Sequence, residues 1–109
     1  MSTKKTAATS RAILIVDDHP MLRRGLAALI EGEPDLAVCG QAASCRDALR
    51  IIRQDKPDLA IVDLGLEGSD GLELIKEIKA SHPQVLTLVL SMHDESLYAE
   101  RAINAGARG

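Results

Sequence analysis

The stretch Ile13-Leu14-Ile15-Val16-Asp17-Asp18 decides the fold of this 109-residue chain. Four aliphatic residues run without a break into two acids. The same pattern, a short aliphatic run that ends on a polar residue, recurs at residues 59–63 and 85–91. Such runs are typical of parallel strands in a sheet that is covered on both faces. The sequence therefore predicts a parallel sheet with helices on both sides.

The polar residues that end these runs should meet in space. In an open parallel sheet the functional crevice lies beyond the carboxyl ends of the strands. We therefore expect Asp17, Asp18, Asp63 and Ser91 to gather at one edge. Three neighbouring carboxylates repel one another, and a divalent cation with oxygen ligands is the usual relief. The pattern predicts a metal site there.

Helix signals alternate with the strand signals. Strands are predicted over 12–16, 36–42, 58–62 and 85–90. Helices are predicted from Pro20, from a cap at Ser44, from Gly71, and from about Glu95 to Gly106. This βαβαβαβα order, with right-handed crossovers, predicts an α/β fold with a doubly wound parallel sheet. Strand order 2-1-3-4 fits the flavodoxin-like arrangement.

Apolar spacing predicts which face of each helix is buried. Ser44 and Asp47 are expected to form a variant of the capping box at the second helix. The predicted buried stripes are Leu22, Leu26, Leu29 and Ile30 in the first helix, Cys45, Ala48, Leu49 and Ile52 in the second, and Gly71, Leu74, Ile75 and Ile78 in the third.

Composition limits the classes of protein. The length suits one domain, and a hydrophobic content of 46% with one Tyr and no Phe or Trp indicates an aliphatic core. A formal net charge of −3 argues against nucleic-acid binding by this segment. No signal peptide and no membrane-length apolar run is evident. We therefore expect a cytoplasmic protein with no membrane contact, in which Cys39 and Cys45 are reduced thiols.

The order and spacing of five motifs resemble the receiver domain of two-component response regulators. The motifs are Asp17-Asp18, Asp63, Asp70-Gly71-Leu72-Glu73-Leu74, Ser91 and Ala105-Gly106-Ala107-Arg108-Gly109. Val16-Asp17-Asp18-His19-Pro20 is similar to the NarL/FixJ subfamily, whose members usually carry a LuxR-type helix-turn-helix after the receiver. The resemblance spans residues 11–109, and residues 1–10 are expected to form a flexible tail.

The resemblance implies a role for each site residue. Asp63 would accept a phosphoryl group from a sensor histidine kinase. Asp18, Asp17 through water, Asp63 and the backbone carbonyl of Gly65 would hold Mg²⁺. The hydroxyl of Ser91 would sense the phosphoryl group. The chain would be a signalling phosphoacceptor with self-catalysed phosphorylation and dephosphorylation, not an enzyme that turns over a separate substrate.

The loop after Asp63 departs from the family pattern. Glu67 stands where the family usually has proline, and Gly65 offers no side chain over the site. His93 and His19 could each be a neighbour of the phosphoryl group. For both, an exposed loop histidine is the favoured interpretation. Thr87 lies inside the fourth strand and is expected to pack.

Receivers also carry a lysine on a fifth strand, followed by a fifth helix. These would fall beyond Gly109, so the sequence predicts a C-terminally truncated receiver. Binding to DNA would then require a missing helix-turn-helix domain. The strand at 85–90 would become an apolar edge, which predicts pairing with a second copy as a homodimer.

Two other functions are weighed against this one. A haloacid-dehalogenase-type phosphohydrolase needs Asp-x-Asp on one loop, and Asp63-Leu64-Gly65 lacks the second acid. A degenerate receiver that binds partners without phosphorylation would not need Asp17, Asp18 and Asp63 together, although the absent lysine is compatible with it. The acidic residues therefore favour a phosphoacceptor.

Overall fold

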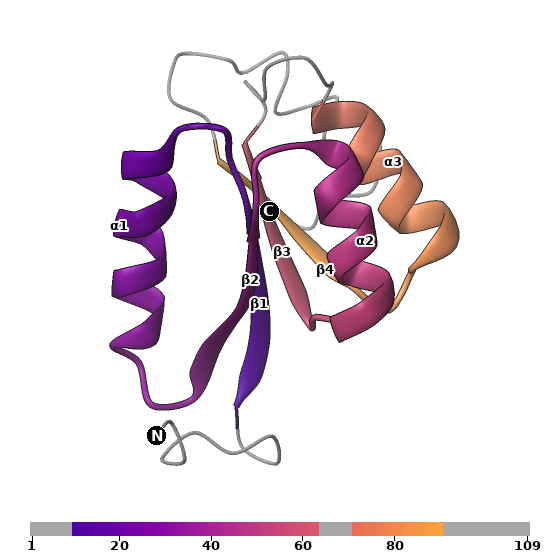
Figure 1. Cartoon of the computed structure of the whole chain (residues 1–109). Coiled ribbons are helices and arrows are strands. Elements are labelled where there is room, and N and C mark those ends of the chain that lie inside the picture. The colour runs from indigo at the N-terminus through magenta and orange to yellow at the C-terminus, as the bar shows by residue number, and fades with distance from the viewer. Residues whose placement is uncertain (1–9, 64–70, 91–109) are drawn as a thin grey trace.

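The computed structural model describes residues 10–63 and 71–90, which form four strands and three helices (Figure 1). The elements are β1 (Arg11–Val16), α1 (Pro20–Glu31), β2 (Leu36–Ala42), α2 (Cys45–Asp55), β3 (Leu59–Asp63), α3 (Gly71–Ser81) and β4 (Leu86–Leu90). Each predicted strand is found within one residue of its predicted bounds. The predicted tail, apart from Ser10, and the predicted helix from Glu95 to Gly106 lie outside the described residues.

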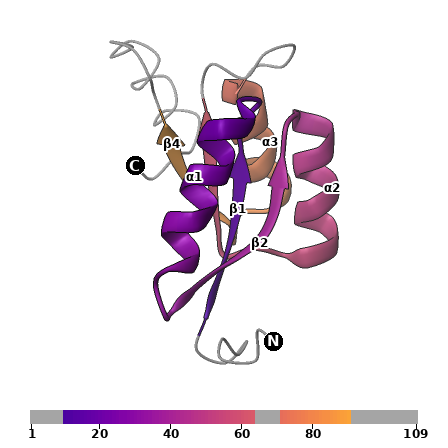
Figure 2. The ribbon, with the colours of Figure 1, turned by 60° about the vertical axis from the view of Figure 1, so that its left-hand side comes forward.

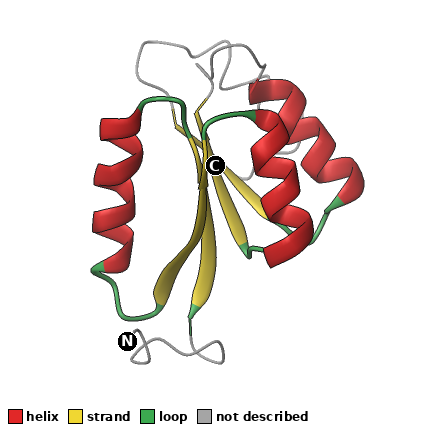
Figure 3. Ribbon diagram, viewed as in Figure 1, coloured by secondary structure: helices red, strands yellow, loops and turns green. Residues whose placement is uncertain are grey.

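The four strands form one parallel sheet in the order β2-β1-β3-β4. This confirms the predicted strand order. In Figures 1 and 3, α1 lies on one side of the sheet, and α2 and α3 lie on the other. Figure 2 turns the molecule so that α1 stands in front of the strands. The result is the doubly wound, three-layer arrangement expected from the alternating elements.

The main hydrophobic core lies between the sheet and the pair α2 and α3. It takes every second residue of the central strands, as strand geometry requires: Leu14 and Val16 from β1, Ala60 and Val62 from β3. All four predicted residues of α3 are buried. In α2, Ala48 and Ile52 are buried as predicted, Cys45 and Leu49 pack against the core in part, and Ile51 joins them.

The α1 layer covers its face of the sheet less completely. No residue of α1 is fully buried, and Leu29, predicted to face the sheet, is 73% exposed. Leu22, Leu26 and Ile30 are half-buried, as predicted. The prediction for Leu29 is wrong because Arg23 and Ala27, on the other side of that stripe, complete the half-buried face of α1 instead. On the outer strand β4, Leu86 and Leu88 keep 46% and 38% of their surface exposed.

Local details fix the approach of α2 to the sheet. The β1–β2 register shifts between Ile13 and Leu14, so that Cys39 has no partner in β1. At the next residue, Gly40, an added Cβ would lie 3.0 Å from Cγ2 of Ile51. Ser44 caps α2 by accepting a hydrogen bond from the backbone N–H of Asp47 at 3.2 Å, as predicted. Close packing of α2 therefore depends on the missing side chain at residue 40.

Two further expectations concern the cysteines and membranes. Cys39 and Cys45 are reduced thiols that form no disulfide in the described part of the chain, each is half-buried, and burial raises the pKa of Cys39. None of the helices in the described ranges has both the length and the apolar character needed to cross a membrane.

Candidate metal site at the carboxyl end of the sheet

The sheet brings Asp17 and Asp63 together. Val16 pairs with Val62 in the parallel register, so the residues that follow, Asp17 and Asp63, are neighbours across β1 and β3. The backbone N–H of Asp17 also donates to the carbonyl of Ala42 at 2.9 Å, which ties it to β2. This confirms that the two acids meet at the carboxyl edge.

The two acids are buried at this edge. Asp17 and Asp63 are 1% and 2% exposed, whereas the side chain of Asp18 is 17% exposed. A third buried polar residue, Thr87, lies within β4 and packs there, as predicted. Burial of two carboxylates beside an aliphatic core is costly unless they are compensated. The two buried carboxylates at the carboxyl edge therefore lower the stability of the fold.

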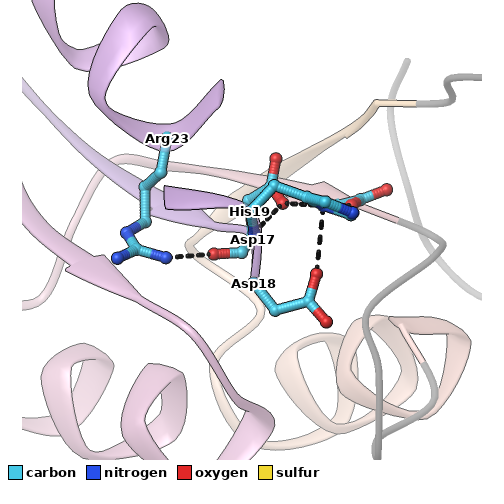
Figure 4. Close-up of polar contacts among 5 residues, drawn as sticks. Asp17, Asp18, His19 and Arg23 are labelled. Carbon is cyan, nitrogen blue, oxygen red and sulfur yellow. Dashed lines mark hydrogen bonds and ion pairs between the residues drawn. The ribbon is translucent and has the colours of Figure 1, made fainter. Parts of the chain in front are cut away.

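His19 directs one ring nitrogen into the acidic cluster (Figure 4). Its Nδ1 lies 2.8 Å from Oδ1 of Asp17, 3.1 Å from Oδ1 of Asp18 and 3.5 Å from Oδ2 of Asp63. The hydrogen bond to Asp17 raises the pKa of His19 above its ordinary value, and the neighbouring negative charges act in the same direction. With 60% of its side chain exposed, His19 is an exposed loop residue, as favoured from the sequence, yet it also belongs to the site.

The sequence held one signal for this role of His19. The residue stands two positions after Asp17, and its backbone N–H donates to Oδ1 of Asp17 at 2.8 Å. This short turn, in which an aspartate side chain binds the backbone two residues ahead, is a common local preference of Asp. The turn brings the backbone of His19 close to the carboxylate of Asp17, and the ring of His19 lies against the same carboxylate.

The acidic cluster fits a divalent cation. One ligand atom each from Asp17, Asp18, His19 and Asp63 can be chosen so that all four lie within 4.8 Å of one another. Oδ2 of Asp17 is buried and has no hydrogen-bond partner among the described residues. Hard divalent cations such as Mg²⁺ and Ca²⁺ prefer carboxylate oxygens of this kind. A cation bound here would compensate the buried oxygen.

Arg23 supports the site from α1, a contact that the sequence analysis missed. Its guanidinium donates a hydrogen bond to the backbone carbonyl of Asp17 at 2.6 Å (Figure 4). This bond joins the first turn of α1 to the end of β1. The sequence did offer one signal for this contact. Arg23 is a basic residue on the half-buried face of the helix that directly follows Asp17 and Asp18.

The other predicted site residues, Gly65, Ser91 and His93, lie outside the described residues. Their roles therefore stay predictions. The structure does place Leu90, the residue before Ser91, opposite Asp63 in the β3–β4 register.

Comparison with known proteins agrees with the geometry. The family described as response regulator receiver domain matches residues 13–109. The transcriptional regulatory protein UhpA of Salmonella typhimurium is 37% identical over 97 residues, which are 89% of this chain and 48% of that protein. The chain thus spans about half the length of the curated relatives that it matches.

Solved structures show the same fold. A LuxR-family two-component response regulator from Aurantimonas sp. SI85-9A1 superposes with a TM-score of 0.86 at 38% identity, over 92% of this chain and 71% of that one. A response regulator from Burkholderia pseudomallei, crystallised with a phosphorylated aspartic acid and a calcium ion, gives a TM-score of 0.81 at 30% identity. That match covers 90% of this chain and 56% of that one.

The family match covers most of the chain, and a LuxR-family response regulator superposes on the fold found here. The acidic residues that carried the resemblance meet at the edge where such a sheet places its site. The chain therefore belongs to the receiver-domain family of response regulators.

Proposed function

We propose that this receiver accepts a phosphoryl group on Asp63 from a sensor histidine kinase, with Mg²⁺ bound by Asp17, Asp18, Asp63 and the backbone carbonyl of Gly65. The observation that carries the proposal is the convergence of three carboxylates, two of them buried, at the carboxyl edge of β1 and β3. The phosphorylated aspartate and calcium ion in the Burkholderia pseudomallei relative support it.

Asp63 is the proposed nucleophile because it ends β3 as a buried carboxylate. One of its oxygens forms a bond to phosphorus while the bond from phosphorus to the histidine nitrogen of the kinase breaks. The leaving imidazole takes up a proton from solvent. The product is an aspartyl phosphate. The kinase supplies the phosphoryl group, so the receiver does not turn over a separate metabolite.

Asp17 and Asp18 position the cation and hold negative charge next to the reacting carboxylate. When bound, Mg²⁺ would neutralise charge on the phosphoryl oxygens. Asp17 is fixed by its backbone bond to Ala42, by the bond from Arg23 and by the turn to His19. The rigid placement of these acids keeps reorganisation small when the phosphoryl group arrives.

Ser91 is the proposed sensor of the phosphoryl group. Its hydroxyl would donate a hydrogen bond to a phosphoryl oxygen, because it directly follows Leu90, the partner of Asp63 in the sheet. The likeness to a transcriptional regulatory protein supports control of transcription by the whole protein. A cytoplasmic location and a DNA-binding helix-turn-helix domain belong to the same proposal and rest on the resemblance to the subfamily.

A homodimer also stays a proposal. In the described part of the chain β4 pairs with β3 alone, and Leu86 and Leu88 remain exposed there. An apolar edge strand of this kind favours association. Light scattering coupled to gel filtration should show a mass that rises with protein concentration. A constant monomer mass would contradict the proposal.

The phosphoacceptor is tested by labelling with acetyl phosphate in the presence of Mg²⁺. The unmodified chain should gain one acyl phosphate that mass spectrometry maps to Asp63. This label should be lost in acid and in alkali, unlike a phosphate ester. Asp63→Asn should remove it, because an amide is not a nucleophile. Asp35→Asn, at an exposed aspartate remote from the carboxyl edge, is the matched control and should label normally. Undiminished labelling of Asp63→Asn would show that another residue is the acceptor.

A further inference from the structure

We propose that Nδ1 of His19 is a nitrogen ligand of the metal site. The site would then favour divalent cations that accept imidazole, such as Ni²⁺, Co²⁺ or Zn²⁺, more than an all-oxygen site does. The inference rests on the proposed metal site and adds a ligand and a selectivity to it. It stands on the position of the ring nitrogen, on a buried oxygen of Asp17 and on the way in which the backbone holds the ring.

The distances from Nδ1 are those between ligands of one ion. Two neighbouring ligands that each lie about 2.1 Å from an octahedral ion are about 3.0 Å apart. Nδ1 of His19 lies 2.8, 3.1 and 3.5 Å from one oxygen each of Asp17, Asp18 and Asp63. A nitrogen that sits next to all three carboxylates in this way is placed to share their cation.

An independent observation points to a cation at the same place. Asp17 is 1% exposed, and its Oδ1 accepts a hydrogen bond from the backbone N–H of His19. The ring Nδ1 also lies 2.8 Å from Oδ1, and a cation bound at Nδ1 would displace any proton on that nitrogen to solvent and take its place beside the carboxylate. Its Oδ2 is buried and has no hydrogen-bond partner among the described residues. A carboxylate oxygen in that position has lost its hydration, which contact with a metal ion would replace.

The backbone holds His19 in place without using its ring. His19 is the N-cap residue of α1, and its side chain makes no capping bond to that helix. Its carbonyl accepts from the N–H of Arg23 at 2.9 Å, and Pro20 follows in the first turn. These constraints fix where the side chain leaves the backbone, and the ring already lies against the carboxylates of Asp17 and Asp18, so that binding a cation costs little additional order. The exposed side of the ring leaves the site open to solvent.

Ligand chemistry gives the expected selectivity. Imidazole nitrogen suits nickel, copper, zinc and iron, whereas carboxylates and water suit magnesium, calcium and manganese. Adding one imidazole to three carboxylates therefore raises the affinity of the site for Ni²⁺ more than its affinity for Mg²⁺. Removal of the imidazole should lower the Ni²⁺ affinity again and leave Mg²⁺ binding to the carboxylates nearly unchanged.

Calorimetric titration of the full chain with Mg²⁺ and with Ni²⁺ tests the selectivity. His19→Ala should weaken Ni²⁺ binding by about 10- to 100-fold, the range already seen when residues that merely orient a ligand are removed. Mg²⁺ affinity should change by less than about threefold. His82→Ala is the matched control, because His82 lies between α3 and β4, at the amino end of the sheet and away from the metal site. Both variants retain Cys39 and Cys45, so that thiol binding of Ni²⁺ affects them equally.

Nitrogen NMR of the histidine rings separates this inference from the proposed function. With diamagnetic Zn²⁺, the Nδ1 resonance of His19 should shift, and that of His82 should not. If Mg²⁺ and Zn²⁺ shift Asp17, Asp18 and Asp63 while His19 Nδ1 stays unchanged, the nitrogen ligand is disproved and the metal site survives. If neither cation shifts any of the three aspartates, both the inference and the proposed metal site fail. Equal loss of Ni²⁺ and Mg²⁺ affinity in His19→Ala would also overturn the selectivity.

Discussion

The two ends of the sheet use their aspartates in opposite ways. At the amino end, Asp58 joins three strands: its carboxylate accepts from the N–H of Ala12 at 2.7 Å, its N–H donates to the carbonyl of Ala12, and its own carbonyl accepts from Leu86. At the carboxyl end, Asp17 is more deeply buried, yet its Oδ2 has no hydrogen-bond partner among the described residues.

This difference separates structural from functional acids. A carboxylate whose oxygen binds backbone N–H groups contributes to stability. A buried carboxylate oxygen without such donors lowers stability until a ligand supplies the missing charge. Substitutions along the sheet should therefore divide into those that change folding and those that change binding.

The largest effect on folding is expected between the two ends, at Gly40. Gly40→Val should lower the free energy of unfolding by about 1–3 kcal/mol, because its side chain meets Ile51, whose Cγ2 and Cδ1 lie 3.0 and 3.3 Å from the position of an added Cβ. Urea denaturation measures it. Gly25→Ala is the control, since nothing lies within 4 Å of its added Cβ, and it should stabilise α1. An unchanged Gly40→Val midpoint would mean that α2 is not held closely against β2.

Mg²⁺ should stabilise the fold through the carboxyl end alone. At about ten times its Kd, Mg²⁺ should raise the free energy of unfolding by about 1.4 kcal/mol, because it binds the native state and not the unfolded chain. Asp17→Asn should lose this gain, and Asp58→Ala should retain it. Thermal unfolding with and without Mg²⁺ gives both values. If Mg²⁺ raises the free energy of unfolding of Asp17→Asn as much as that of the unmodified chain, the cation does not bind through Asp17 and the two ends do not differ in this way.

A smaller loss of stability is expected at the amino end. Asp58→Ala should cost about 1 kcal/mol, since the N–H of Ala12 loses its carboxylate acceptor but can turn to water. Denaturation in the absence of metal measures it against Asp35→Ala, an exposed aspartate for which a change near zero is expected. A neutral Asp58→Ala would show that this acid has no structural role.

The strands, their order and the burial of α3 follow from local sequence pattern. Aliphatic runs place β1 and β3 in the centre, and the chain order of strands and helices then brings Asp17 next to Asp63. The cap at Ser44 could be predicted because it involves residues three apart.

Two of the remaining features depend on tertiary contacts that no local pattern contains, and a third depends on a short turn that leaves the direction of a ring open. Leu29 has the spacing of a buried residue, but the rotation of α1 against the sheet leaves it exposed. Arg23 resembles a surface charge until the end of β1 lies beside it. The ring of His19 could point to solvent or to the acids, and the turn to Asp17 decides between them.

An NMR titration with Mg²⁺ that follows the carboxyl carbons of the aspartates tests the central claim most directly. Asp17, Asp18 and Asp63 should shift together and saturate with one Kd, while Asp58 and Asp35 should stay in place. Asp17→Asn should weaken the response of the other two acids. Shifts confined to exposed aspartates, or no shift at Asp17, Asp18 and Asp63, would contradict the assignment of the carboxyl end as the metal-binding, phosphoacceptor end of the sheet.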